Sequence, residues 1–292
     1  MNIIVNLNKP KGITSQQAVT KVKKMLGVRK AGHTGTLDPM ATGVLLVCLN
    51  EATKVSRFLL DKDKTYRARL KLGERTDTLD AEGKLIDTRD VPTFTPEHIV
   101  RIADQFIGKI MQKPPMYSAI KLNGQPLYKL ARKGLEVERA ERLVEIYHIE
   151  ILQVDLPYVE LSVSCSKGTY IRTLCDDIGL MLGTGAHITA LERTGIGPFT
   201  IDASVTFDIL GQGISDGSPC VSSMDHALSD LPEVMLDKSD CSRARNGIPL
   251  SREIFGGIPD NVYVRMKDSS GSLFGIGMTK NEKIIIERNL NF

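Results

Sequence analysis

The chain has 292 residues, 41% of them hydrophobic and 25% charged, with 38 Lys and Arg against 35 Asp and Glu. These proportions are those of an ordinary globular protein and exclude the disordered and fibrous classes. The longest apolar runs are far shorter than a membrane span, no signal peptide opens the sequence, and the five cysteines are scattered without a CxxC pair. We therefore expect a cytoplasmic protein without membrane association.

The first third of the chain predicts several strands and one helix. The helix is expected to begin near Ser15, as its N-cap, because apolar residues recur from Ala18 to Leu26 at helical spacing, and Gly27 should stop it. The other elements expected in this part are a strand at 3–7, a turn at 9–12, a loop at 32–43, a buried strand at 44–49 and an alternating strand at 65–72.

The middle of the chain predicts a second helix and then an interruption. The helix is expected from Thr95, as N-cap, to Phe106, with Pro96 in its first turn. Residues 108–143 then lose the periodicity and contain a Pro pair, an Asn-Gly turn and a short basic helical piece at 127–133, which indicates a surface insertion. A half-buried strand at 159–165 and a helix at 171–181 are expected next.

The last part of the chain predicts a second, smaller domain. Residues 208–232 are poorly periodic and rich in turn residues, which indicates a boundary. Beyond it, short apolar segments at 262–266, 273–278 and 283–287 predict a β-rich unit. We therefore expect an α+β protein with two domains, 1–232 and 233–292, the first of which carries the insertion at about 108–143.

The net charge of +3 hides a strong segregation of charge. Residues 1–37 hold seven basic residues and residues 105–135 hold six, with no acidic residue in either segment, whereas the rest of the chain sums to −10. Basic surfaces attract nucleic acids because bound phosphates release counterions. We expect these thirteen side chains to line one cleft; the alternative is two solvated surfaces that lack acids.

The common metal and nucleotide motifs are missing from the sequence. The five histidines are scattered, and the acids at Asp77, Asp80 and Glu82 lack the ligand spacing of a calcium loop. Neither a Walker loop nor a GxGxxG follows a predicted strand. We expect no metal and no cofactor.

The most distinctive segment is GHTGTLDPMATG at 32–43. It ends the first acid-free stretch with a single carboxylate, Asp38, and Pro39 pushes the Asp38 backbone toward an extended conformation. A lone acid at the rim of a basic surface would meet a bound polyanion directly. The alternative is that Asp38 only initiates a turn with Pro39, which is the common use of such a pair.

Five blocks in order along the chain, beginning with this loop and its preceding turn, resemble the TruB family of tRNA pseudouridine synthases. The blocks are KPKG at 9–12, GHTGTLDPMATGVL at 32–45, DKDKTY at 61–66 with LGERTDTLDAEG at 72–83, PPMYSA at 114–119 with Lys121, and KGTYIR at 167–172.

The resemblance implies a fold and a reaction. The fold is the pseudouridine synthase fold, a central mixed and largely antiparallel sheet flanked by helices, followed by a small C-terminal PUA-like β-barrel. The reaction is isomerisation of uridine to pseudouridine in the T-loop of tRNA, at the position conventionally numbered 55, without metal or cofactor. The bond from C1′ to N1 breaks, the uracil turns, and C5 bonds to C1′.

The resemblance also assigns roles to single residues. Asp38 matches the essential carboxylate, whose first step stays open among attack at C1′, addition at C6 and removal of a sugar proton. Arg172 matches its partner, and a guanidinium there favours the ionised carboxylate. Tyr170 matches a phenol near the reacting sugar. Four further positions match substrate binding. His33 matches the residue that enters the vacated base stack, and Tyr66 matches the ring that stacks on the flipped uracil. Leu191 matches an apolar pocket residue, and Lys9 matches a residue that supports the loop.

The partner implied is tRNA, bound through its T-arm and, by the C-terminal domain, through its acceptor arm. The insertion favours recognition by the protein alone over the guide-RNA-dependent relatives, so we expect a monomer with no obligatory protein partner. A second hypothesis is a tRNA-folding chaperone in which catalysis is secondary. A third, a hydrolase using Asp38 as nucleophile, lacks a metal or phosphate loop.

Overall fold

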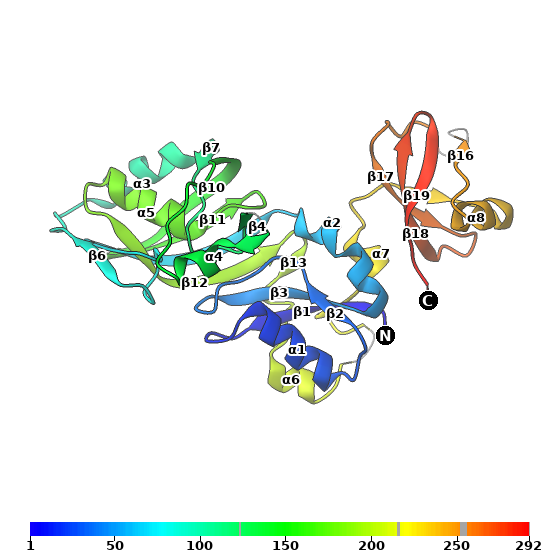
Figure 1. Ribbon diagram of the computed structural model, residues 1–292, viewed down its shortest axis with the longest axis horizontal. Helices are drawn as coiled ribbons and strands as arrows, with labels where there is room; N and C mark the ends of the chain where they lie inside the picture. The colour runs from blue at the N-terminus through cyan, green and yellow to red at the C-terminus, as the bar shows by residue number, and fades with distance from the viewer. Residues whose placement is uncertain (123, 215–216, 252–255, 292) are drawn as a thin grey trace.

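The computed structural model describes residues 1–122, 124–214, 217–251 and 256–291. Asn123 of the predicted Asn-Gly turn and residues 215–216 of the predicted boundary lie outside the described residues. Figure 1 shows a large N-terminal part and a smaller C-terminal part beside it. No described helix is both long and apolar enough to cross a membrane.

A ten-stranded sheet forms the centre of the N-terminal domain. Its order is β14-β1-β3-β12-β4-β11-β10-β7, with β2 beside β3 and β13 beside β12. Among the described strands of this sheet, only the short β3–β12 pairing is parallel, so the predicted mixed and largely antiparallel sheet is confirmed. The strands are β1 Ile3–Lys9, β2 Ala31–His33, β3 Thr42–Leu49, β4 Lys64–Leu72, β7 Gly108–Gln112, β10 Arg142–Asp155, β11 Tyr158–Cys165, β12 Ala186–Ile196, β13 Phe199–Thr200 and β14 Val221–Ser223.

Two groups of helices pack on this sheet (Figure 1). Helix α5 packs on β12 and α3, and helix α1 packs on β2, β3 and α6. Their buried stripes, Ala18, Val19 and Val22 on α1 and Leu174 and Ile178 on α5, join one core with the strands. The elements outside the sheet are α1 Ser15–Met25, η1 Asn50–Val55, α2 Ser56–Leu60, the hairpin β5 Glu74–Thr76 and β6 Leu85–Thr88, α3 Pro96–Ala103, η2 Asp104–Phe106, α5 Ile171–Met181, α6 Phe207–Gly211 and α7 Met224–Ala227.

The start of α1 differs from the prediction by one residue. Thr14, not Ser15, is the N-cap: its hydroxyl accepts from the Gln17 amide at 3.1 Å, and the Gln17 side chain accepts from the Thr14 amide at 2.8 Å. Ser15 is instead buried and exchanges hydrogen bonds with the backbone of Leu37, at 2.8 and 3.0 Å. Ser15 therefore ties the helix to the 32–43 loop.

The insertion that leaves the sheet is shorter than the sequence predicts. Gly108–Gln112 form β7 and pair with β10 from Arg142 onward, so these residues belong to the sheet. The insertion proper is residues 113–141, which carry β8 Lys121–Leu122, β9 Gln125–Pro126 and α4 Leu127–Ala131. The prediction extended too far because the sequence of β7 has no apolar period. Half-buried and exposed residues alternate along this strand.

In its described residues, 233–251 and 256–291, the C-terminal domain has a five-stranded sheet and the helix α8. The strand order is β15-β17-β18-β19-β16. Val234, Met266 and Phe274 belong to its own core. The elements are β15 Glu233–Met235, α8 Lys238–Arg245, β16 Leu250–Ser251, β17 Tyr263–Lys267, β18 Leu273–Lys280 and β19 Lys283–Asn289.

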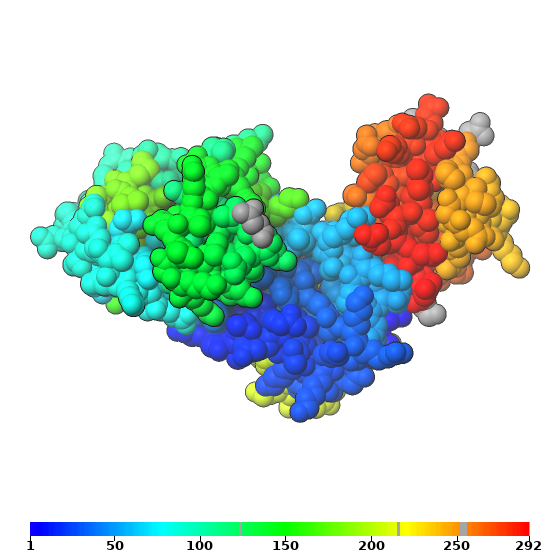
Figure 2. Space-filling model, viewed as in Figure 1, coloured from blue at the N-terminus to red at the C-terminus, as the bar shows by residue number. Residues whose placement is uncertain are grey.

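A second buried cluster joins the two domains. Ile276 and Leu290 of the C-terminal domain pack with Val55 and Leu59 of η1 and α2, and the ring of Tyr263 lies edge-on to that of Phe58 at 4.8 Å. Figure 2 shows this contact between the red and light blue surfaces. The two domains therefore share apolar surface that each would otherwise expose.

Residues 208–232, which the sequence predicts as a poorly periodic boundary at the end of the first domain, contribute short elements to that domain in their described part. Strand β14 pairs with β1, and α7 follows it directly. Asp225 of α7 then binds Arg265 and Lys267 of β17 at 2.7 and 2.9 Å. A three-residue strand and a four-residue helix are too short to produce a readable period, which is why the sequence did not reveal them.

Candidate active site

One large cavity of about 1190 Å³ lies between the 32–43 loop, the insertion and the start of α5. Figure 2 shows the insertion, in green, directly over the N-terminal segment, in blue. Segments far apart in the sequence meet here: the start of α1, the loop, β4, residues 77–84, the insertion, residues 166–172 and β12. The volume of the cavity exceeds that of one nucleotide, so several linked nucleotides can enter it.

Asp38 and Arg172 face each other in this cavity. The Arg172 Nε lies 2.9 Å from Asp38 Oδ2, and Nη2 donates to Oδ1 at 3.4 Å. The Arg172 side chain is 4% exposed, whereas that of Asp38 is 33% exposed. The buried guanidinium of Arg172 thus contacts one side of the Asp38 carboxylate, while part of that carboxylate stays exposed to the cavity.

Arg172 is held by more than Asp38. It donates to the carbonyl oxygens of Thr78 at 2.8 Å and Tyr117 at 2.7 Å. Its Nη1 also lies 3.5 Å from Oδ2 of Asp80. One cation therefore serves two carboxylates and two carbonyls, and it is fixed from three separate segments of the chain.

Asp80 braces its own turn as well as facing Arg172. Its Oδ1 accepts from the Thr78 hydroxyl at 2.6 Å and from the Glu82 amide at 3.1 Å. The side chain is buried, although the residue is among those that line the cavity. The contacts of Asp80 in this structure thus brace its own turn and face Arg172.

The surroundings of Asp38 oppose its ionisation overall. Burial raises the pKa of Asp38 above its ordinary value of 3.8, and Asp80 adds to this effect. Arg172 and Lys9 pull the pKa of the carboxyl down, without cancelling the effect of burial. Arg172 thus favours the carboxylate as expected, but Asp38 still takes up a proton at a higher pH than an exposed aspartate.

Lys9 supports the loop from below. Its side chain is fully buried, and Nζ donates to the carbonyl oxygens of Pro10 and Ile13 at 2.9 Å and of Pro39 at 3.4 Å. Burial lowers the pKa of Lys9 to about 8. The structure places Lys9 behind the loop and outside the cavity lining, so we keep it as a supporting residue and not as one that touches substrate.

Arg193 is a second support of the loop, and the sequence did not reveal it. This side chain, 1% exposed, donates to the carbonyl oxygens of Val44 at 2.8 Å and Gly35 at 3.2 Å. Gly43 allows the close approach, because a Cβ there would lie 2.2 Å from the Arg193 carbonyl oxygen. A single arginine in the apparently ordinary strand β12 carries no local signal for this role.

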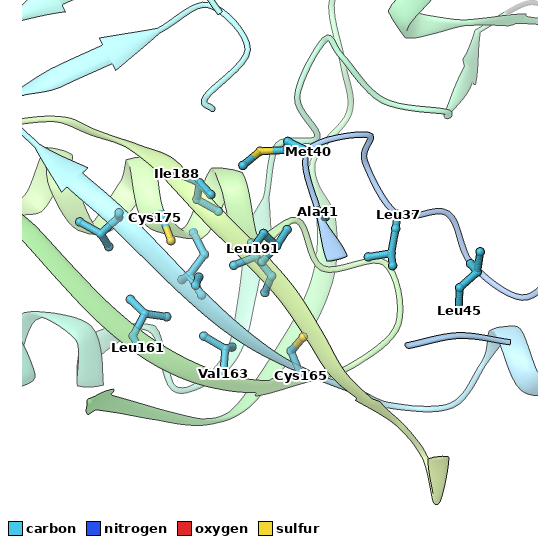
Figure 3. Close-up of a cluster of buried hydrophobic side chains, with 14 of the residues drawn as sticks. Leu37, Met40, Ala41, Leu45, Leu161, Val163, Cys165, Cys175, Ile188 and Leu191 are labelled. Atoms are coloured by element: carbon cyan, nitrogen blue, oxygen red, sulfur yellow. The ribbon is translucent and has the colours of Figure 1, made fainter. Parts of the chain in front are cut away.

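Apolar side chains on the underside of the loop fasten it to the core. Figure 3 shows Leu37, Met40 and Ala41 near Leu191 of β12 and the core strands. Each of the four is at most 7% exposed, and all belong to one buried cluster. Leu191 also lines the cavity, so it is both a core residue and an apolar wall of the site.

Tyr66 and Tyr170, which the family resemblance assigns to the site, both line the cavity. Tyr66 of β4 packs against the core and lies opposite Arg193 in the register of β4 and β12. Tyr170 lies in the N-cap position of α5, two residues before Arg172. Burial raises the pKa of both phenols above 10, so both rings stay uncharged at neutral pH.

His33 closes the other side of the cavity. It ends the short strand β2, which pairs with β3, and the ring is half-buried. Burial and Arg193 lower the pKa of His33 below 6.5. The imidazole is therefore neutral at pH 7 and suits contact with a base rather than with a phosphate.

The predicted arrangement of charge is wrong. Of the thirteen basic residues in the two acid-free segments, only Arg132 lines the cavity. Lys9 is buried behind the loop, and the exposed lysines of α1, Lys21, Lys23 and Lys24, lie outside the lining. The cations that do line the cavity come mostly from other segments, namely Lys64, Lys84, Arg142, Lys167, Arg172 and Arg193.

In the described part of the chain, no three His, Cys, Asp or Glu side chains are placed to hold a metal ion together. The carboxylates that do come together, Asp38 and Asp80, share the guanidinium of Arg172 as their cation. The ionisable groups that line the cavity around Arg172 include these two carboxylates and the phenols of Tyr66 and Tyr170.

Comparison with known proteins identifies the family. Residues 23–171 match the model described as "TruB family pseudouridylate synthase (N terminal domain)", and residues 172–230 match "tRNA pseudouridylate synthase B C-terminal domain". The chain belongs to the TruB family. It is thus a pseudouridine synthase, an isomerase, and the recognition made from its motifs is confirmed.

Relatives in the TruB family extend over nearly the whole chain. The tRNA pseudouridine synthase B of Vibrio atlanticus is 44% identical over 285 residues, which are 94% of this chain and 89% of the relative. That of Clostridium tetani is 44% identical over 284 residues, 97% of each chain. The similarity thus includes the C-terminal domain as well as the cavity.

Solved structures share the fold at lower identity. A chain from an H/ACA RNP bound to a substrate RNA containing 2′-deoxyuridine has a TM-score of 0.76 at 28% identity, covering 99% of this chain and 85% of the other. A chain from a Cbf5–Nop10–Gar1 complex has the same TM-score at 31% identity, covering 99% and 84%. The large mixed sheet with its helices is therefore the pseudouridine synthase fold.

Proposed function

We propose that this chain converts uridine to pseudouridine in the T-loop of tRNA, at position 55, with Asp38 as the essential carboxylate. The observation that carries the proposal is the pairing of Asp38 with Arg172 in the large cavity. The relatives named tRNA pseudouridine synthase B support the choice of tRNA. Position 55 and the role of Asp38 rest on the motif around residues 32–43.

The target uridine leaves its stack to reach Asp38. Taking a base out of a folded loop costs a few kcal/mol of stacking. Tyr66 offers its ring to the flipped uracil, Leu191 supplies an apolar wall, and His33 occupies the place that the base leaves. All three residues line one cavity, which supports these assignments.

The reaction breaks the bond from C1′ to N1 and joins C5 to C1′. The uracil gains a proton at N1 and loses one at C5, so proton transfers have to accompany the exchange of bonds. Asp38 acts as the ionised group, and Arg172 stabilises that charge in surroundings that otherwise disfavour it. Tyr170 lies in the same cavity with its phenol protonated, so it takes the C5 proton as it releases its own proton to solvent, and N1 gains its proton from solvent.

The C-terminal domain is the part we assign to the tRNA acceptor arm, as a PUA-like unit. Its five-stranded sheet and its firm attachment through the shared core support a fixed second contact. The N-terminal domain carries the T-arm site, and no second protein is needed to complete the cavity. We propose that the enzyme acts as a monomer.

The test is conversion of a T-arm stem-loop by Asp38→Asn. We expect the variant to bind RNA with nearly unchanged affinity and to form no pseudouridine, as mapped by carbodiimide labelling. Asp61→Asn is the matched control, because Asp61 lies at the cavity but pairs with the exposed Lys167. Turnover by Asp38→Asn would refute the mechanism, and a label outside the T-loop would refute the position.

A second activity, promotion of tRNA folding, is favoured by the basic surface outside the cavity. Lys21, Lys23 and Lys24 are exposed on α1, and no ion pair of theirs occurs among the described residues. Such cations bind phosphate without sequence preference. Asp38→Asn should therefore still promote tRNA folding, whereas Lys21→Glu with Lys24→Glu should lose part of it. Equal folding by the latter variant and the wild type would remove this second function.

A further inference from the structure

We propose that Gln112 is a positioning residue of the active site. Through Gln112, the placement of Tyr170 and Arg172 depends on the insertion, residues 113–141, being packed against the start of α5. The inference rests on the proposed roles of Asp38 and Arg172. Gln112 is the last residue of β7 and the last before the insertion begins. It is 2% exposed, and no motif in the sequence drew attention to it.

The Gln112 amide grips the backbone of Tyr170 at both polar atoms. Its Oε1 accepts from the Tyr170 amide at 2.8 Å, and its Nε2 donates to the Tyr170 carbonyl at 3.1 Å. Tyr170 is the N-cap of α5, in an extended conformation, and its side chain makes no capping hydrogen bond. A side chain of strand β7 therefore fixes the N-cap residue of α5. It supplies one acceptor and one donor to the Tyr170 backbone, as a neighbouring strand does in a sheet.

The root of the insertion touches the same two residues. The carbonyl of Tyr117 accepts from Arg172 at 2.7 Å. Ser118, whose side chain is buried, lines the same cavity as Tyr170. Residues 112–117 therefore contact Tyr170 at its backbone and Arg172 at its guanidinium. Any movement of this root away from α5 breaks these three hydrogen bonds.

The body of α5 does not depend on Gln112. Leu174, Cys175 and Ile178 anchor the helix in the main core. Loss of the Gln112 contacts should therefore leave the helix in place but free its first turn, where Tyr170 and Arg172 stand. A displacement of about 1 Å at a reacting group is enough to cost on the order of 100-fold in rate.

The experiment measures RNA affinity and single-turnover rate separately for Gln112→Glu and Gln112→Met. Gln125→Glu, in β9 of the insertion, is the matched control. We expect the rate at saturating RNA to fall about 10- to 100-fold in both Gln112 variants, with the RNA Kd within about threefold of the wild type. The control should keep its rate.

The pH profile distinguishes positioning from a general loss of stability. At pH 8 a glutamate at 112 accepts from the Tyr170 amide but repels the Tyr170 carbonyl; once protonated, it donates to that carbonyl again. The rate of Gln112→Glu relative to the wild type should therefore recover as pH falls, whereas that of Gln112→Met should not. Rates are taken well below the melting temperature of each variant.

The outcomes separate this inference from the proposed function. Loss of turnover in Asp38→Asn together with normal rates in both Gln112 variants would overturn the inference alone. A change confined to Kd would assign Gln112 to RNA binding and also overturn it. Turnover by Asp38→Asn would instead overturn the proposed function.

Discussion

Removal of the Arg172 cation gives the sharpest test of how the site is held together. In Arg172→Met, the hydrophobic side chain keeps much of the volume but pairs with neither carboxylate. Asp80 is left with a side chain that is 8% exposed, and Asp38 with one that is 33% exposed. The carbonyls of Thr78 and Tyr117 lose their donors as well.

The expected loss of stability is large for a single substitution. Breaking a buried pair by removing one partner costs about 3–5 kcal/mol, because an uncompensated charge stays buried. At about 2–4 °C per kcal/mol for a chain of this class, the melting temperature should fall by roughly 6–20 °C. Thermal unfolding followed by circular dichroism measures this directly.

The loss should depend on pH with a definite sign. Without the guanidinium, the folded state holds the proton of Asp38 more tightly than the unfolded state does, so stability falls as pH rises through the titration of Asp38. The deficit of Arg172→Met relative to the wild type should therefore be larger at pH 8 than at pH 5. Adding Asp80→Asn removes one of the stranded charges and should restore part of the lost stability.

Two results would refute this reasoning about the site. One is an equal drop in melting temperature at pH 5 and pH 8, which would mean that lost packing and not stranded charge sets the cost. The other is a failure of Asp80→Asn to restore any stability in the Arg172→Met background.

Three further changes have expected outcomes. Asp80→Asn alone should move the acidic limb of the rate profile to lower pH, because Asp80 raises the pKa of Asp38; an unmoved limb between pH 4 and 8 contradicts this. Asp177→Asn should stabilise the fold by about 1 kcal/mol at pH 8 and not at pH 4, since burial raises the pKa of Asp177 to about 6 and its ionised form is disfavoured; equal gains at both pH values in chemical denaturation would argue against it. Gly43→Ala should cost roughly 2 kcal/mol more than Gly12→Ala in the same measurement, because both glycines have positive φ but only the first would place a Cβ against backbone, at 2.2 Å.

Much of the secondary structure could be predicted from local patterns. The helix that begins after Thr95 has the expected cap, and the alternation at 65–72 lies within β4. These features depend on neighbours within a few residues, where backbone sterics and the period of burial act. The misplaced cap at Ser15 shows the limit of such reasoning, since a distant partner, Leu37, uses the side chain that would otherwise cap the helix.

The candidate site divides in the same way. The sequence located the 32–43 loop and, through the family resemblance, Arg172, Tyr170, Tyr66 and His33, which the structure brings to one cavity. It did not reveal the grip of Gln112 on a backbone 58 positions away. Nor did its charge segregation place the basic residues correctly, because exposure on a helix does not specify which way that helix faces.

By itself, then, the sequence determined the cap at Thr95, the apolar stripes and a single carboxylate in a glycine-rich loop, all features set by short-range sterics and by the periodicity of burial. Only the tertiary structure decided which further side chains support the loop and the start of α5. Arg193 and Gln112 act through contacts to backbone carbonyls and amides, which every residue possesses and no motif marks. Their partners are chosen by the order and register of the strands, and these depend on the packing of the whole sheet.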